Sequence, residues 1–194
     1  MKLDPFNNSN KIQWSIRVFL LLMIIGVFLS SNLYAKTAKE IDASVDAAIE
    51  RFYKQVKGAK EYVEKSKGML VMPNVIKGAF IIGGEYGEGA LRVGGKSVDY
   101  YNTISGSIGF QIGGQAKDII LLFMTDEALK QFRASKGWEA GVDGNVALIT
   151  VGAGERADTR TLKDPIVGFV FDAKGLIADI SLKGAKFSKV DKKE

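Results

Sequence analysis

The sequence contains neither cysteine nor histidine. Their absence excludes disulfide bonds, thiolate nucleophiles, zinc sites of the usual kind and every catalytic triad that needs an imidazole. Proline is also scarce, with 3 residues in 194, whereas glycine is abundant, with 22. This balance argues against a low-complexity chain and predicts a fold punctuated by glycines. An enzyme built from this sequence would have to use carboxylates, lysines, tyrosines or hydroxyl groups.

Long hydrophobic runs are missing as well. The apolar run Val18–Leu29 has 12 residues, whereas a helix that spans a bilayer needs about 20. It follows the basic residues Lys2, Lys11 and Arg17, and the small residue Ala35 ends the segment. This order is typical of a cleaved secretory signal peptide, so we predict a signal peptide over residues 1–35 and a periplasmic or otherwise exported chain starting near Lys36. The alternative is an uncleaved anchor in the inner membrane.

The charge imbalance is small. The net charge is +5 for the whole chain, and it falls to +3 once the three basic residues and one acidic residue of positions 1–35 are left out. A surplus of this size does not predict a nucleic-acid partner.

Residues 37–66 have the period of one long amphipathic helix. Apolar residues recur every three or four positions from Ile41 to Val63, which predicts a single buried stripe. Thr37 and Glu40 form the pattern of a capping box at its start. Gly68 is the predicted stop.

From residue 69 the period changes to that of strands. The alternation over 98–112 predicts a half-buried strand, or two strands joined at a bulge near Gly106, with Val98, Tyr100 and Ile104 on the inner face. The apolar run 118–124 predicts a central strand, and Thr125 is expected to cap a short helix over 126–134 that Gly137 ends. Further strands are predicted at 144–152, 166–172 and 176–182, with a hairpin turn at 172–175 and a loose tail at 188–194.

No regular alternation of strands and helices is present, so we expect the α+β class. The predicted architecture is a single domain over residues 36–194, with the long N-terminal helix and a mainly antiparallel, glycine-rich, strongly bent sheet over 69–187. One short helix is inserted in the sheet.

Glycine-rich stretches do not predict a nucleotide site. The best dinucleotide-like motif, 152–157, precedes a polar stretch ended by Pro165, where the phosphate-binding helix should stand. We expect Gly87 and Gly89 to form a tight reversal and Gly94-Gly95 the next turn. The carboxylates are better explained as structural or solvated groups, so we expect no enzyme, no cofactor and no metal.

The lysines toward the end of the predicted helix are the most suggestive charged feature. An anionic membrane surface would attract such a helix end, although the helix could instead pack on the sheet with its lysines merely solvated. The candidate headgroup-binding residues are Lys54, Lys57, Lys60, Lys65 and Lys67. Secondary candidates on the sheet are Lys77, Arg92 and Lys96.

Several spaced blocks resemble the SYLF domain over about residues 40 to 190. The blocks are GMLVMPNVIKGAFIIGGEYGEGAL, SGSIGFQIGGQAKDIILLFMT and DPIVGFVFDAKGLIADISLKGAK. Eukaryotic members typically carry Trp-Ser-x-Pro where this chain has Asp99-Tyr100-Tyr101-Asn102, so the chain resembles the exported bacterial branch.

The resemblance implies phospholipid binding, partly through a basic amphipathic N-terminal helix. Actin binding belongs to the eukaryotic members, and an exported chain would meet no actin. We therefore expect a non-enzymatic, envelope-associated protein that binds anionic phospholipid membranes. The alternatives are a carrier of a small apolar ligand in a pocket between sheet and helix, and a purely structural envelope protein.

Overall fold

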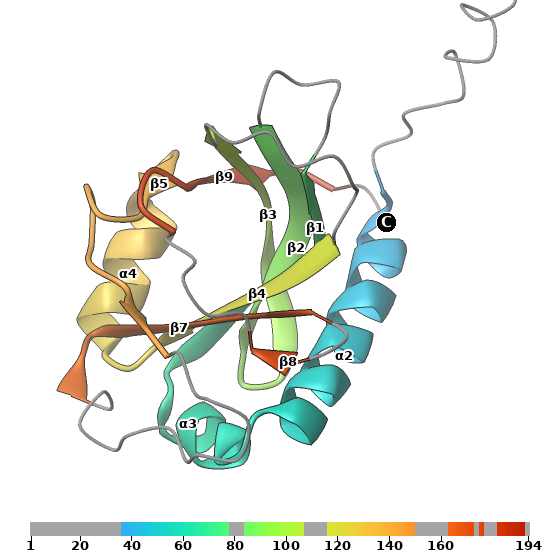
Figure 1. Ribbon diagram of the computed structural model, residues 1–194. Coiled ribbons are helices and arrows are strands. Elements are labelled where there is room, and N and C mark those ends of the chain that lie inside the picture. Colours follow the sequence, from blue (N-terminus) through green and yellow to red (C-terminus); the bar gives the residue numbers. More distant parts are fainter. Residues whose placement is uncertain are drawn as a thin grey trace, which may run out of the picture. The chain divides into compact units, whose positions relative to one another are not determined.

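The computed structural model in Figure 1 describes residues 36–77, 84–106, 116–149, 163–172, 175–176 and 182–192. All of them belong to one compact unit, Lys36–Glu194. The predicted signal peptide, residues 1–35, lies outside the described residues, as do residues 107–112, 150–152 and 177–181 of the predicted strands.

The predicted long helix is two helices. Helix α2 spans Ala38–Gln55 and begins with the expected capping box of Thr37 and Glu40. Helix α3 spans Ala59–Lys65. Between them Gly58 has a φ of 88°, a conformation in which glycine meets no steric penalty. The period hid this break because Val56 and Ala59, on either side of Gly58, are both buried in the same core.

The strands form one curled sheet (Figure 1). Its order is β5-β9-β3-β2-β1-β4-β7-β6, with β8 paired to β7, and the β6–β7 pair alone among these is parallel. The α+β class with a mainly antiparallel sheet is therefore confirmed. The strands are β1 (Gly68–Lys77), β2 (Gly84–Val93), β3 (Lys96–Gly106), β4 (Ala116–Phe123), β5 (Trp138–Glu139), β6 (Ala147–Leu148), β7 (Ile166–Asp172), β8 (Gly175–Leu176) and β9 (Lys186–Val190).

Side chains are buried on both faces of the sheet. One core lies under α2 and α3, and it contains Phe52, Ile120 and Phe169. The other lies toward helix α4 (Asp126–Ala134), and it contains Leu121 and Phe132. Residues 119–123 of strand β4 alternate between the two cores, which explains why this run is apolar without interruption and confirms β4 as a central strand.

The inner face predicted for β3 is wrong in part, since Tyr100 does pack against the core under α2 but its neighbours on that face do not. Tyr101 is almost fully buried, and its ring centroid lies 4.9 Å from that of Phe132 in α4. Val98 and Ile104, predicted to face the core, are instead 40% and 56% exposed. The alternation itself was correct, but it could not show that α4 covers the face carrying the more polar residues.

The predicted reversal at Gly87 and Gly89 is also wrong, because β2 runs through both residues. A Cβ on Gly89 would collide with the carbonyl oxygen of Val71, and one on Gly87 would lie 2.7 Å from Val75 Cγ2. The pairing of β1 shifts register between Val71 and Ile76. The two glycines therefore allow β2 to follow a bulge in β1, as the expectation of a bent sheet requires. The turn at Gly94-Gly95 is confirmed, with φ of 58° and 79°.

The chain's C-terminal stretch is not loose as predicted. Strand β9 extends to Val190 and pairs with β3 through Tyr100↔Val190 and Ile104↔Lys186. The many charged residues of this stretch led to the prediction of a loose tail. The stretch is nevertheless a strand, and its Phe187 is buried in the core, with 1% of its surface exposed. The predicted hairpin at 172–175 is confirmed by the pairing of Asp172 with Gly175.

The short helix α4 has the predicted bounds and the predicted cap, since the Thr125 hydroxyl accepts from the Ala128 amide. It ends at Ala134, before the predicted stop at Gly137.

Candidate membrane-contact surface and its surroundings

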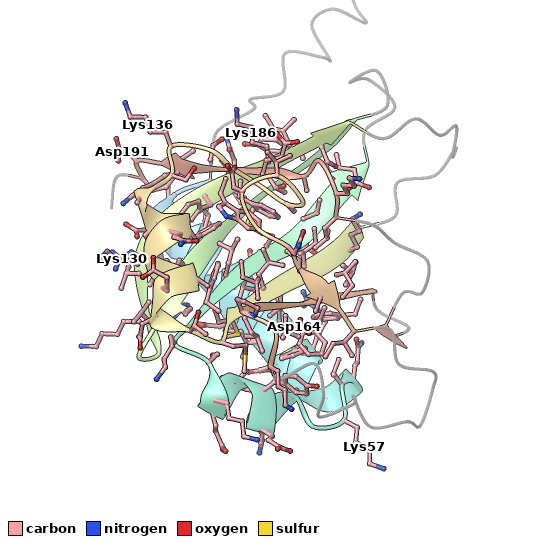
Figure 2. All side chains as sticks on the ribbon, turned by 90° about the vertical axis from the view of Figure 1, so that its left-hand side faces the viewer. Lys57, Lys130, Lys136, Asp164, Lys186 and Asp191 are labelled. Atoms are coloured by element: carbon pink, nitrogen blue, oxygen red, sulfur yellow. The ribbon has the colours of Figure 1, made fainter. Side chains whose placement is uncertain are left out.

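Five lysines line the end of α2, the break, α3 and the link to β1. We call residues 54–67 the basic segment. Its lysines are Lys54, Lys57, Lys60, Lys65 and Lys67, and all five are exposed. Figure 2 shows Lys57 projecting away from the ribbon, on a different part of the molecule from Lys130, Lys136 and Lys186. The five primary candidate residues are thus exposed along one continuous segment of the chain.

Local carboxylates engage these lysines only weakly. Lys54 lies 3.9 Å from Glu50, and Lys65 lies 2.8 Å from Glu61, each one turn away on its own helix. Exposed pairs of this kind contribute about 0 to 1 kcal/mol. The segment contains two acidic residues, Glu61 and Glu64, against its five lysines. It therefore presents a surplus of positive charge that is available to an external anion.

The apolar stripe of α2 is not available. Ile41, Val45 and Phe52 are fully buried against the sheet. The Phe52 ring meets that of Phe169 edge-on, with centroids 4.8 Å apart. The helix is amphipathic because it covers the core, and insertion of its apolar side into a bilayer would require the helix to leave the sheet.

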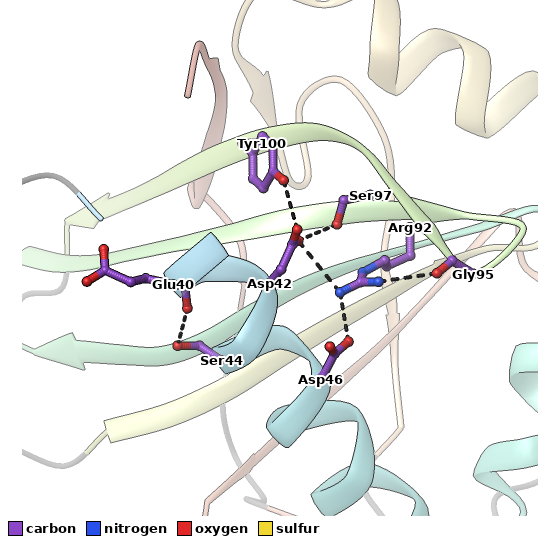
Figure 3. Close-up of polar contacts among 8 residues, drawn as sticks. All are labelled: Glu40, Asp42, Ser44, Asp46, Arg92, Gly95, Ser97 and Tyr100. Carbon is purple, nitrogen blue, oxygen red and sulfur yellow. Dashed lines mark hydrogen bonds and ion pairs between the residues drawn. The ribbon is translucent and has the colours of Figure 1, made fainter. Parts of the chain in front are cut away.

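The secondary candidates are scattered. Arg92 is held inside a polar cluster, where its guanidinium lies 2.7 Å from Asp46 and 3.6 Å from Asp42 and donates to the Gly95 carbonyl (Figure 3). Lys96 is exposed at the β2–β3 turn. Lys77 ends β1, and its side chain lies outside the described ones.

The cluster around Arg92 attaches α2 to the β2–β3 hairpin. The Tyr100 hydroxyl donates to Asp42 at 3.0 Å. Burial, and then this contact with a carboxylate, raise the pKa of Tyr100. Sequence reasoning assigned Arg92 to a lipid site because it could not see that two helix carboxylates face it.

A second attachment, missed by sequence reasoning, is centred on Asp118 at the start of β4. Its carboxylate is buried and accepts from the Arg51 guanidinium of α2 at 2.8 Å and from the backbone N–H of Asn74 at 2.9 Å. Asn74 has a φ of 53° within the β1 bulge. The one sequence feature that pointed to this contact was an aspartate directly before the apolar run 119–124.

Each carboxylate of β2 has an ammonium partner. Glu85 lies 2.8 Å from Lys117, and Glu88 lies 2.7 Å from Lys192. Burial alone would raise the pKa of Glu88, but hydrogen bonds from Lys192 and Tyr86 hold it below its ordinary value. Burial, followed by the hydrogen bond to Glu88, raises the pKa of Tyr86 to about 12. These carboxylates act in structural contacts, as the sequence predicted.

A similar buried carboxylate joins β3 to α4 and β9. Asp99 accepts from Arg133 at 2.9 Å and pairs with Lys189. The nearby Tyr101 hydroxyl is buried without a hydrogen-bond partner among the described residues. Burial and, secondly, the charge of Asp99 raise the pKa of Tyr101 to about 12.

Two other surface features bear on binding. Ile76, Tyr86 and Ile104 pair in register across β1, β2 and β3 and are all exposed, so they form an apolar row. A hollow of about 400 Å³ lies beside α4, lined in part by Trp138, Asp143, Asp164 and Ile166. No group of three potential metal-ligating side chains occurs within the part of the chain that the structure describes.

Among the described helices, none is long and apolar enough to cross a membrane. Residues 104–194 match the profile of the family described as Ysc84, Las17-binding protein actin regulator. The match begins within β3 and runs to the end of the chain, so it does not include the basic segment. No curated protein sequence matches the chain.

Proposed function

We propose, on the premise that residues 104–194 make this chain a member of the Ysc84 (SYLF) family, that it is a non-enzymatic protein which binds anionic phospholipid surfaces outside the cytoplasm. The family match agrees with the resemblance to the SYLF domain in the C-terminal part of the chain. The lipid-binding role rests on a separate observation, namely the exposed lysines of the basic segment.

That observation supports a peripheral, electrostatic mode of binding. Lys54 has 78% of its side chain exposed, and Lys57 and Lys60 follow it at a spacing of three residues. Each basic residue close to an anionic bilayer contributes about 1 kcal/mol, and the attraction falls off within a Debye length. Binding by these three lysines should therefore depend on anionic lipid and should weaken as salt increases.

The buried stripe of α2 argues for contact at the headgroups rather than insertion of this helix. Removing Ile41, Val45 and Phe52 from the core would expose large apolar side chains, each worth about 1.5 to 3 kcal/mol when buried. An attached helix that presents lysines avoids this cost.

The family description names binding to Las17 and regulation of actin. We do not extend either to this chain, because the predicted signal peptide would deliver it to a compartment without an actin cytoskeleton. We propose the lipid surface, which an exported protein does meet, as its partner.

A carrier of apolar ligands is the alternative in a different class. It was expected to use a pocket between sheet and helix, where Val45 and Phe169 are both fully buried in the same core. The hollow beside Trp138 lies on the other side of the sheet and includes two aspartates. Retention of an apolar ligand through purification would favour the carrier.

Liposome flotation with a matched pair of variants tests the proposal. Changing Lys54, Lys57 and Lys60 together to Glu should reduce binding to anionic vesicles more than tenfold, at about 1 kcal/mol per charge. The control changes Lys130, Lys136 and Lys186 to Glu, which alters the net charge equally on a different part of the surface (Figure 2). The control should retain most binding.

Equal losses in the two variants would show that net charge, not the basic segment, governs binding. Unchanged binding by the first variant, with unchanged circular dichroism, would show that the basic segment is not the lipid site. The apolar row of Ile76, Tyr86 and Ile104 would then be the next surface to test.

A further inference from the structure

Both ends of the described unit meet at one buried carboxylate. Glu88, in the middle of β2, is 7% exposed. Its Oε1 accepts from Lys192 Nζ at 2.7 Å and from the Tyr86 hydroxyl at 3.0 Å. Its Oε2 accepts from the backbone nitrogen of Lys36 at 3.2 Å. Figure 1 shows the C-terminal end beside the start of α2.

The two oxygens of this carboxylate have unequal partners. Lys192 brings a full positive charge to Oε1, whereas Lys36 offers Oε2 only a neutral amide. A buried carboxylate oxygen is satisfied better by a charged donor, since charge-assisted hydrogen bonds are about twice as strong as neutral ones. The site would therefore gain if the nitrogen of Lys36 carried a charge.

The sequence independently predicts that this nitrogen becomes the N-terminus of the mature chain. Residues 1–35 have the basic start, the apolar run and the small final residue of a signal peptide, and the predicted cut falls between Ala35 and Lys36. Hydrolysis of that bond by an export protease consumes one water. It leaves a carboxylate on Ala35 and an amine on Lys36, and the amine takes up a proton at neutral pH.

We propose that cleavage after Ala35 converts the nitrogen of Lys36 into an α-ammonium group and that Glu88 is the docking site for this new N-terminus. The resulting cluster joins the start of α2, the centre of β2 and the segment after β9 through one carboxylate. Processing thus strengthens the closed domain, and this role is independent of the proposed lipid surface.

The position of the new charge makes a partner necessary. Lys36 directly precedes Thr37, the N-cap of α2. A positive charge there faces the positive end of the helix dipole, which is unfavourable. Because Glu88 is buried and already oriented by Tyr86 and Lys192, it can compensate this repulsion with little loss of side-chain entropy.

A two-by-two experiment tests the docking site. The full chain is expressed with its own N-terminal segment in an exporting bacterium, and intact mass establishes the first residue of the purified protein. The α-amino group is then removed by selective N-terminal transamination, which leaves lysine side chains unchanged, in both the parent and Glu88→Gln. Urea unfolding at pH 7 is compared among the four proteins.

Transamination should lower the folded-to-unfolded ratio of the parent at least about fivefold, as expected for loss of a charged hydrogen bond, and should have little effect in Glu88→Gln. The difference should be present below about pH 8 and disappear at higher pH, where the ammonium deprotonates. Equal effects in the two backgrounds, or a first residue other than Lys36, would overturn the proposal.

A second measurement does not depend on a variant that folds. The native parent is treated with an amine-reactive reagent at pH 7.5, with and without urea, and labelling of the α-amino group is followed by mass spectrometry. For each amine, the labelling rate in the native protein is divided by the rate in unfolded protein. Docking on Glu88 predicts that this ratio is at least about tenfold lower for the α-amino group than for the exposed Lys57. Equal ratios of native to unfolded labelling rate at the two amines would rule docking out.

Discussion

The two parts of the N-terminal helical segment use their charges differently. In residues 38–53, Asp42 and Asp46 reach Arg92 of β2, and Arg51 reaches Asp118 of β4. In the basic segment, Lys54 and Lys65 reach acidic residues of their own helices, and Lys67 lies 3.9 Å from the exposed Asp126 of α4. Charges of the first part therefore hold the helix on the sheet, whereas those of the second remain accessible to a partner. Changes in the first part should alter stability, and changes in the second should alter binding.

The largest effect is expected from the apolar side of the first part. Phe52→Ala should destabilise the protein by about 3 to 5 kcal/mol, because it leaves a cavity where the ring contacts Phe169 and Phe171. Urea unfolding measures the loss, with the exposed Tyr53→Ala as the control. If both variants lose the same stability, the helix does not pack as described.

Removing the buried carboxylate should cost less. Asp118→Asn weakens the contacts with Arg51 and the Asn74 amide, and we expect a loss of about 2 to 3 kcal/mol, since hydrogen bonds to charged groups are each worth about 1.5 to 3. The matched variant is Asp46→Asn, whose carboxylate is 64% exposed. It should lose no more than about 1 kcal/mol. Similar losses would contradict the difference in burial between the two ion pairs.

The pH dependence of stability should report on a second buried carboxylate, that of Glu88. Its pKa is lowered on folding, since Lys192 and Tyr86 outweigh the effect of burial. A lowered pKa gives stability that is present above the unfolded value, near 4.3, and is lost as the pH falls through the folded value. Thermal unfolding of the parent and of Lys192→Met between pH 7 and pH 3 measures this contribution as the difference between their melting temperatures. The two curves should converge at low pH, and a constant gap would contradict this role of Glu88.

The smallest effect on stability is expected in the basic segment. Lys57→Gln should change the free energy of unfolding by less than about 0.5 kcal/mol, as is usual for surface substitutions. It should weaken binding to anionic vesicles roughly fivefold, at about 1 kcal/mol per charge. Lys130→Gln is the control and should change neither quantity. A large loss of stability in Lys57→Gln would place this lysine with the structural charges instead.

Several elements followed from local patterns alone. The Thr37–Glu40 capping box, the α4 cap at Thr125, the apolar strand β4 and the Gly94-Gly95 turn all lie where the sequence placed them. Each depends on neighbouring residues or on burial of both strand faces. The exposed lysines of the basic segment were likewise recognisable from spacing, because no distant residue is needed to keep a lysine in water.

Other features depended on residues far apart in the chain. The buried face of β3 was decided by Phe132, and the strand β9 by its pairing with β3. Gly89 proved to be a site of close backbone approach because the β1 bulge lies opposite it. None of these partners could be identified without the sheet order.

The sequence by itself determined the α+β class, the helix caps and the basic surface, since propensity, capping and solvation act over a few residues. The tertiary structure decided which charges are structural. Arg92, Asp118 and Glu88 resemble ordinary surface residues until residues 46, 67 and 104 positions away in the chain are brought within hydrogen-bonding distance of them. Burial then makes each carboxylate require its partner, because an unpaired charge removed from water is costly.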